Sequence, residues 1–538
     1  MKTVVRHVSQ NESDFRTTPE FLVHWIDDLP LHDHYKTMQL LYEALGHISR
    51  DKNLSSVSKL ELLNMLEPPL AYAISVLKRA FLRKSFPLSS SAMNCAKLVA
   101  RLQNAMSSNY LKALAQTPLE EVNTHNLICY SQLVKNALLS LEKSFITCYQ
   151  TYQIPTTGLW RESHKLYHIT SKLKKQTRLG LIITNNQNES AFNALHDDIS
   201  TTYKRILLLS LAQPYRFNQH ELEHLYHVIT RCACDLNIAQ VENRLQRPRG
   251  IFLAYLENGQ APCYFSFEKD LEQDDCLIID TSSLVSRIHS HLHHESIKEF
   301  QSTPNTVLER LRESWDIMPS RKLTRTHRRE RATISLGLDY VHQLLSMKEQ
   351  KQFPSSTEIP TLLSTAEERV AKRNPKVSAE LINSSESGAC VLIHTDGPKI
   401  GIGHLVAIKR PEDLDWQISS VKWIRQFANK TMEAGIEILD HKAEALTVYS
   451  REPAQQPLPA IILPEHNDAE KSASMLLPSA SYKRGDAITI NMHGIVQSLL
   501  LTKQINNTED FTHFHFKSFN EQAPKTRIVK TLLPQSVA

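Results

Sequence analysis

A long stripe of apolar side chains is the feature of this sequence that most restricts its fold. Over residues 127–148 they recur at steps of three and four, at Leu127, Tyr130, Val134, Leu138, Leu141, Phe145 and Cys148. Positions three and four apart lie on one face of an α-helix, so this spacing predicts a long helix with a single apolar face. Such a face must be covered by neighbouring helices, because propensity alone rarely stabilises a helix in water.

The stripe belongs to a longer helical region, which we expect to form a bundle over residues 31–240. Shorter apolar patterns of the same kind occur at Leu98–Met106, Leu207–Leu211 and Leu222–Ile229. Pro68 and Pro69 are expected to end or kink an early helix. The polar residues 1–30 are expected to be a flexible segment. With 13 glycines in 538 residues, the chain has too few for glycine-rich nucleotide loops or a repetitive all-β fold.

Charge and cysteine content exclude several classes of protein. The formal net charge is +5, which is too small for general coating of nucleic acid. The eight cysteines form no CxxC pair, so neither a zinc cage nor a disulfide framework is expected. No stretch reaches the ~18 consecutive apolar residues of a membrane span, and the first residues lack the apolar core of a signal peptide. We therefore expect a cytoplasmic protein without membrane insertion.

A small α/β segment is predicted over residues 245–305. Asn258 and Gly259 are the favoured pair for a tight hairpin turn, and they lie between two strand-like runs. The predicted strands and helix of this segment are Gly250–Leu256, Cys263–Phe267, Cys276–Asp280 and Leu284–Phe300.

After Arg331 the pattern becomes that of β-strands. Ser420–Arg425 (SVKWIR) roughly alternates polar and apolar residues, as a half-buried antiparallel strand does. Predicted strands within residues 306–450 are Thr333–Leu338, Ala389–His394, His404–Lys409, Ile418–Arg425 and Ile436–Leu439. The polar, partly helical stretch Tyr340–Arg373 interrupts them. A second β-rich block covers residues 451–538, with strands at Ala460–Leu463, Ala487–Asn491, Ile495–Leu501 and Phe511–Phe516.

Two segments carry candidate binding residues. The first is Arg321–Arg331 (RKLTRTHRRER), with six cationic side chains in eleven residues. Guanidinium groups bind phosphate through forked donors and stack on flat bases. The second is a polar turn that leads into a strand (NSSESGACVLI, residues 383–393). Asn383 and Ser385 share one side of an extended chain and can read a base edge, and Gly388 permits close backbone approach. Together they suit a ligand with phosphate and guanine groups.

An RxxxR element ahead of a β-barrel, followed by (D/N)xSxxG, resembles the PilZ domain of bacterial cyclic di-GMP receptors, here in a long form with an N-terminal helical domain. The resemblance covers about Leu311 to Val448, with Tyr340–Arg373 as an insertion. RxxxR matches in two registers, Arg321/Arg325 and Arg325/Arg329, and we favour the set centred on Arg325. The resemblance implies that the arginines bind phosphate and guanine and that the Asn and Ser contact a guanine base. The ligand-binding residues it implies are Arg321, Arg325, Arg328, Arg329, Asn383, Ser385 and Gly388.

Other interpretations of individual residues stay open. The arginine run alone can be a solvated basic loop; binding of nucleic acid is not expected, because the aromatic residues of a single-strand binder are missing. His289 and His293 can share a metal, but a solvated histidine-rich helix face is favoured and no metal site is expected. The pair His196–Asp197 is similar to HD phosphohydrolases. The sequence contains no GxxxxGK[ST], HExxH or GxSxG, so we expect no enzyme.

The sequence thus predicts an α+β multidomain chain: a flexible segment (1–30), a helical bundle (31–240), a small α/β segment (245–305), a PilZ-like antiparallel β-barrel (306–450) and a C-terminal β extension (451–538). The resemblance implies a cyclic di-GMP receptor without a cofactor, in pilus, motility or biofilm control. We expect the helical domain to bind a protein partner and ligand binding to reorganise the arginine segment. The alternatives are a ligand-free PilZ-like scaffold or interaction protein and, ranked lower, a helical metal phosphohydrolase.

Overall fold

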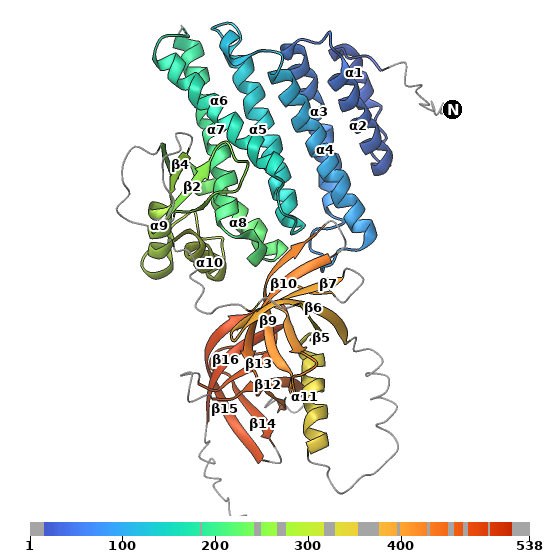
Figure 1. Cartoon of the computed structure of the whole chain (residues 1–538), viewed down its shortest axis with the longest axis vertical. Helices are drawn as coiled ribbons and strands as arrows, with labels where there is room; N and C mark the ends of the chain where they lie inside the picture. Colours follow the sequence, from blue (N-terminus) through green and yellow to red (C-terminus); the bar gives the residue numbers. More distant parts are fainter. Residues whose placement is uncertain are drawn as a thin grey trace, which may run out of the picture. The chain divides into compact units, whose positions relative to one another are not determined.

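The computed structural model describes residues 15–182, 186–240, 249–265, 276–316, 326, 329–352, 376–394, 399–427, 431–449, 457–465, 472–492 and 495–518 (Figure 1). The chain divides into two compact units. The first holds residues 1–322 together with Trp423–Met432. The second holds Leu323–Lys422 and Glu433–Ala538.

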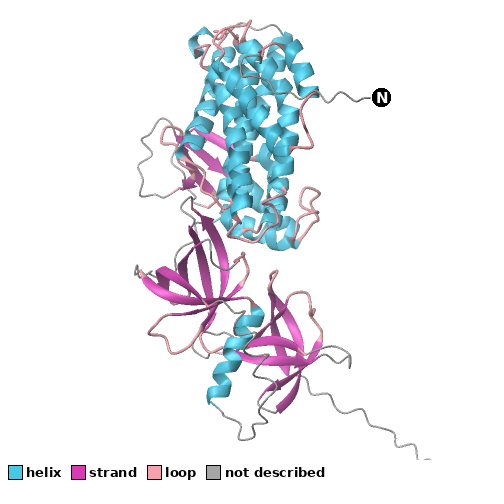
Figure 2. Ribbon diagram, turned by 90° about the vertical axis from the view of Figure 1, so that its right-hand side faces the viewer, coloured by secondary structure: helices cyan, strands magenta, loops and turns pink. Residues whose placement is uncertain are grey.

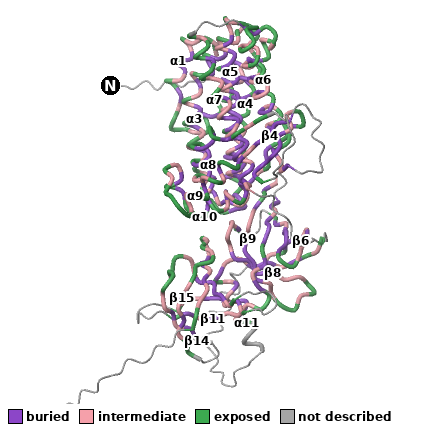
Figure 3. Tube along the Cα trace, turned by 90° about the vertical axis from the view of Figure 1, so that its left-hand side faces the viewer, coloured by how far each residue is buried: buried purple, intermediate pink, exposed green. Residues whose placement is uncertain are grey.

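Helices packed side by side make up most of the first unit, as predicted. They are α1 (Pro19–Asp27), α2 (His34–Arg50), α3 (Ser56–Lys78), α4 (Ser90–Leu114), α5 (Leu127–Gln150), α6 (Thr157–Arg178), α7 (Asn186–Leu211) and α8 (Gln219–Cys232), with 3-10 turns at Leu119–Glu121, Pro214–Arg216 and Ala233–Asp235. The apolar stripe lies on α5, where all its members except Cys148 are buried. Figure 3 shows buried stretches, in purple, along the helices of the bundle. No helix in the described ranges is long and apolar enough to cross a membrane.

One expectation for this region is wrong, and one of the two alternatives for Pro68 and Pro69 is excluded. Residues 1–30 were expected to be flexible, but Pro19–Asp27 form α1, because the Thr18 side chain caps its first turn and Leu22 and Trp25 are buried. Pro68 and Pro69 do not end a helix; they lie inside α3, which continues to Lys78. Buried leucines on both sides of the prolines hold α3 in the bundle although each proline removes one backbone donor.

A four-stranded antiparallel sheet follows the bundle in the same unit, in the order β1-β4-β2-β3. Its elements are β1 (Asn237–Gln240), β2 (Ile251–Tyr255), β3 (Cys263–Tyr264), β4 (Cys276–Asp280), α9 (Ser282–His293) and α10 (Asn305–Asp316). We predicted that residues from 306 onward belong to the barrel, but α10 belongs to this first unit. The buried Trp315 explains this, because its indole N–H donates to the Leu208 carbonyl on α7 (3.3 Å).

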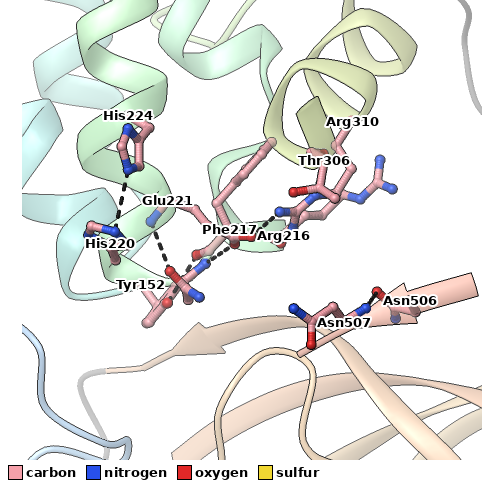
Figure 4. Close-up of polar contacts among 11 residues, drawn as sticks. Tyr152, Arg216, Phe217, His220, Glu221, His224, Thr306, Arg310, Asn506 and Asn507 are labelled. Atoms are coloured by element: carbon pink, nitrogen blue, oxygen red, sulfur yellow. Dashed lines mark hydrogen bonds and ion pairs between the residues drawn. The ribbon is translucent and has the colours of Figure 1, made fainter. Parts of the chain in front are cut away.

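Arg310 ties α10 to the end of the bundle (Figure 4). Its guanidinium donates to the Arg216 carbonyl (2.8 Å) and to the Glu221 carboxylate, and it lies over the ring of Phe217 (4.5 Å to the centroid). The hydroxyl of Tyr152 donates to the Phe217 carbonyl (3.0 Å). These contacts connect the α5–α6 turn, the start of α8 and α10.

The second unit contains the predicted PilZ-like barrel. Its strands are β5 (Glu330–Leu336), β6 (Val377–Ser385), β7 (Gly388–His394), β8 (Leu405–Lys409), β9 (Gln417–Gln426) and β10 (Thr431–Asp440). They form one of the two barrels of strands drawn in Figure 2. The strands close in the order β10-β7-β6-β5-β8-β9. Residues Trp423–Met432, from the end of β9 to the start of β10, are grouped with the first unit.

The predicted C-terminal β extension is a second closed barrel. Its strands are β11 (Glu444–Tyr449), β12 (Leu458–Leu463), β13 (Ser474–Pro478), β14 (Ala487–Met492), β15 (Ile495–Asn507) and β16 (Phe511–Ser518), in the order β11-β12-β13-β16-β15-β14. It begins before the expected residue 451. Glu444–Tyr449 were assigned to the PilZ-like barrel, but β11 pairs with β12 and β14 of the second one.

The expected insertion provides the helix that joins the two barrels. Helix α11 (Leu338–Gln352) falls largely within Tyr340–Arg373. Its buried residues Leu338, Val341, Leu344 and Leu345 form one apolar core with residues of both barrels, namely Leu405, Ala407, Ile418, Ile461, Leu463, Leu476 and Phe511. Asp510, between β15 and β16, accepts hydrogen bonds from the backbone N–H of Leu338 (3.3 Å) and of Leu405 (2.8 Å). The two barrels therefore share a core and a polar clamp.

We predict that Asp510→Ala destabilises the second unit. The substitution leaves the backbone N–H groups of Leu338 and Leu405 without this acceptor, at a cost of about 1–3 kcal/mol. Urea unfolding followed by circular dichroism should show a lower midpoint than for the wild type. Glu412→Ala, which removes an exposed carboxylate of the same unit, is the matched control and should unfold like the wild type. Equal midpoints for all three proteins would contradict the clamp.

Candidate functional site

The polar residues of the second candidate segment lie in the β6–β7 hairpin. Asn383 and Ser385 are in the last three residues of β6, and Gly388 is the first residue of β7. The prediction of a polar turn from residue 383 is therefore wrong in its position, because the turn is Glu386–Ser387. Ser385 pairs with Gly388 and Asn383 with Cys390, and the register shifts between Leu381 and Asn383. Such a bulge re-aims the side chains that follow it.

The two candidate base-reading side chains differ in their surroundings. Asn383 is 9% exposed, so its amide is largely enclosed, and Ser385 is half-buried. The Ser385 hydroxyl donates to the Gly388 carbonyl (3.2 Å). This hydrogen bond spans the turn, and it leaves the hydroxyl oxygen able to accept a further hydrogen bond.

Gly388 is required by the packing of the barrel. A Cβ atom at this position would lie 2.6 Å from the carbonyl oxygen of Ile436 on β10. Next to it, the backbone N–H of Ile438 donates to the Ser387 carbonyl (3.0 Å). The structure thus gives this glycine a role in closing the barrel that is independent of any ligand.

The structure describes four residues of the arginine segment, namely Thr326 and residues 329–331. Arg321, Arg325 and Arg328 lie outside the described residues. Arg329 is described, and its side chain is 81% exposed, with Nε 3.7 Å from a carboxylate oxygen of Glu380 on β6. An ion pair this exposed contributes little to stability, so little free energy opposes exchange of the Glu380 carboxylate for another anion.

Thr326 connects the two candidate segments. Its backbone N–H donates to the Ser384 carbonyl (2.9 Å), and the Ser384 N–H donates to the Thr326 carbonyl (3.1 Å). Thr326 directly follows Arg325 in the sequence, and Ser384 lies between Asn383 and Ser385. The two segments, almost sixty residues apart in the sequence, therefore meet beside β6. Sequence reasoning missed this pairing, although the alternation of Val377, Ala379 and Leu381 with polar residues could have predicted β6.

The other candidate sites gain no support. The rings of His289 and His293 lie 4.6 Å apart on α9, but no group of three or more potential metal ligands occurs among the residues the structure describes. The His196 ring nitrogen lies 3.1 Å from the Lys174 ammonium and 3.4 Å from Asp197. Burial and then the Lys174 charge lower the pKa of His196, and an ammonium at the ring nitrogen is unfavourable for metal binding there.

Comparison with known proteins divides the chain into three regions, and the middle one includes the small sheet, α9 and α10, which the structure groups with the helical bundle. Family models match residues 21–242 (Cyclic-di-GMP receptor FimW, N-terminal domain), residues 251–361 and 348–445 (the middle PilZ domain of that receptor) and residues 444–519 (FimW C-terminal beta-barrel domain). The chain belongs to this family. The Cyclic-di-GMP receptor FimW of Pseudomonas aeruginosa is 22% identical over 570 residues, which cover 95% of this chain and 92% of that protein. No solved structure matches the chain.

The comparison confirms the resemblance to PilZ receptors and the α+β multidomain architecture. The matched family is one of receptors, which bind a ligand rather than convert it, so the expectation of a binding protein rather than an enzyme is also confirmed. The match for the C-terminal domain begins at residue 444, where β11 begins. The roles of the seven candidate residues stay predictions.

We predict that Gly388→Ala destabilises the PilZ-like barrel by roughly 1–3 kcal/mol, since the added methyl group meets the Ile436 carbonyl. Thermal unfolding should show a lower midpoint. Gly46→Ala on α2 is the matched control, because a Cβ there meets only the Arg50 side chain at 3.7 Å. It should stabilise the helix by about 0.5–1 kcal/mol. A Gly388→Ala protein as stable as the wild type would contradict the packing role.

Proposed function

We propose that this chain is a cytoplasmic receptor for cyclic di-GMP and that the ligand binds at the β6–β7 hairpin and the arginine segment. The pair of hydrogen bonds between Thr326 and Ser384 carries this proposal. Because of these hydrogen bonds, Thr326, which directly follows Arg325, lies beside the strand that contains Asn383 and Ser385. The 22% identical relative is a cyclic-di-GMP receptor, which supports the same ligand.

In this proposal each candidate residue has a distinct task. Arg321, Arg325, Arg328 and Arg329 bind the two phosphates through charge-assisted hydrogen bonds, and at least one guanidinium stacks on a guanine. Ser385 and Asn383 bind the hydrogen-bonding edge of a guanine. Gly388 maintains the hairpin on which they lie. Guanine binding requires the largely enclosed amide of Asn383 to become accessible, so a small rearrangement of the hairpin accompanies binding.

The proposed location and process have more general support. All eight cysteines are free thiols, which agrees with a reducing compartment such as the cytoplasm. A role in pilus, motility or biofilm control rests on the resemblance to PilZ receptors alone. We propose that the helical unit binds the protein partner that receives the signal.

Calorimetric titration of the full chain with cyclic di-GMP tests the binding site. Arg325→Ala should weaken binding about tenfold or more, because a hydrogen bond to a charged group contributes about 1.5–3 kcal/mol. Arg484→Ala, which removes an exposed arginine of the second barrel, is the control and should bind like the wild type. Unchanged affinity in Arg321→Ala, Arg325→Ala and Arg329→Ala would refute the site.

Thr326 provides a second variant for the same titration. Thr326→Pro removes the N–H that donates to the Ser384 carbonyl, so it should weaken binding although no ligand contact is removed. Thr326→Ala keeps both backbone hydrogen bonds and should retain the wild-type affinity. If the wild type itself does not bind, the ligand-free scaffold becomes the better interpretation.

We further propose that ligand binding is relayed through Trp423–Met432. Within the first unit, the backbone N–H of Gln426 donates to the Tyr152 carbonyl (2.9 Å), and the Arg425 guanidinium lies 5.2 Å from the centroid of the Tyr215 ring. These residues continue strands β9 and β10 of the PilZ-like barrel. A rearrangement of that barrel therefore acts directly on residues that pack with the helical bundle.

Hydrogen exchange measured with and without cyclic di-GMP tests the relay. The exchange rate of the Gln426 amide should change when the ligand is added, because its acceptor belongs to the helical unit. The amides around Asn109 on α4 are an internal reference, because the Asn109 side chain is buried and donates to the Leu45 carbonyl. Their exchange rates should not change. If the ligand binds and no amide of Trp423–Met432 responds, the relay is wrong and the binding proposal stands.

A further inference from the structure

A cavity of about 640 Å³ lies between α3, α4 and α5 in the first unit. Figure 1 labels these three helices in the bundle. Small-molecule sites typically have volumes of about 300–1,000 Å³ and a mostly apolar lining. Apolar side chains from all three helices line this cavity, among them Leu70, Ile74, Met106 and Leu139. It is separate from the proposed nucleotide site, since every lining residue belongs to the helical bundle.

Polar side chains join α3 to α5 along the cavity. The Asn136 amide donates to Asn64 (2.9 Å), and the Lys143 ammonium pairs with Glu67 (2.6 Å). The Lys78 ammonium donates to the side-chain oxygen of Gln150 (3.1 Å). The lining residues of α4 are buried, whereas Lys143 is exposed and Glu67 is half-buried. Helix α4 therefore forms the floor, and the polar pairs lie at the rim.

One polar atom of the floor has no hydrogen-bond partner among the residues that the structure describes. It is the buried side-chain oxygen of Gln103, a residue that is 3% exposed. A buried acceptor without a donor is unfavourable. Because Gln103 lines the cavity, a ligand with a hydroxyl or amide N–H part-way along its length would satisfy this oxygen.

The rim also carries a cation whose protein partner is neutral. Lys143 is paired with Glu67, whereas Lys78 donates to the uncharged amide of Gln150. Burial and the neighbouring Lys143 charge lower the pKa of Lys78 to about 8. An anionic group at Lys78 would offset both effects, so the charge distribution of the cavity favours an acid over a base.

We propose that this cavity binds an elongated amphipathic carboxylic acid. The carboxylate pairs with Lys78, the apolar chain lies along Ile74, Met106 and Leu139, and a hydroxyl or amide group of the chain donates to Gln103. The cavity has a suitable length, because Asn64 and Lys78 both line it and lie fourteen positions apart on α3, or about 21 Å at the rise of an α-helix.

Calorimetric titration of the full chain with four matched long-chain compounds tests this proposal. Oleate supplies the acid and the chain, and ricinoleate adds a mid-chain hydroxyl. Oleyl alcohol and oleylamine replace the carboxylate with a neutral and a cationic group. Ricinoleate should bind best, oleate next, oleyl alcohol more weakly, and oleylamine weakest. Equal binding of oleate and oleylamine, or no saturable binding of either acid, would overturn the proposal.

Variants separate the individual contacts. Lys78→Met should weaken the binding of oleate about tenfold, as expected for a lost charge-assisted hydrogen bond, and leave oleyl alcohol unaffected. Lys97→Met, at an exposed lysine of α4, is the control. Gln103→Leu should remove the advantage of ricinoleate over oleate. Leu139→Trp should fill the cavity and prevent binding of both acids, with circular dichroism as the check on folding. Wild-type affinities in both Lys78→Met and Gln103→Leu would refute the assignment.

Discussion

The apolar face of α11 is the constraint on which the second unit depends. Four of its residues, Leu338, Val341, Leu344 and Leu345, are buried in a core to which both barrels contribute. Small barrels have little interior volume, so a helix that packs against both gives them a larger common core than either has alone. The Asp510 carboxylate holds α11 to the PilZ-like barrel, because it accepts hydrogen bonds from the first residue of α11 and from the first residue of β8.

The candidate ligand site depends on this barrel through its strand pairing. Strand β5 pairs with β6 and β8, and the Thr326–Ser384 bridge continues the β5–β6 pairing toward the arginine segment. The absence of a side chain at Gly388 lets β7 approach β10. Strand register therefore brings the arginine segment to the hairpin, and no contact between candidate side chains is needed for that placement.

Much of the fold could be predicted from the sequence, because its signals are local. The apolar stripe of α5 and the alternation in β9 have the period of the element itself. The sequence analysis does not predict β6, because the polar residues at its end indicate a turn, although Val377, Ala379 and Leu381 alternate with polar residues in its first half. The units to which α10 and β11 belong are determined by contacts with distant residues. Trp315 of α10 donates to Leu208, and Thr447 of β11 pairs with Asn491, and no local sequence pattern contains such contacts. The types of the site residues could be predicted from the sequence. The pairing of Thr326 with Ser384 could not, because it is made by backbone groups and does not depend on the type of side chain. The cavity under α3 and α5 likewise arises from three helices together.

The shared core also determines how the chain can be divided for experiments. Its family description separates a middle domain from a C-terminal barrel near residue 444, which suggests a PilZ fragment that ends there. Such a fragment would retain α11 but lose Ile461, Leu463, Leu476 and Phe511, which cover part of its apolar face. The exposed surface would be continuous and apolar, and surfaces of this kind promote self-association. A well-behaved fragment of the second unit must therefore carry both barrels and extend at least to Ser518.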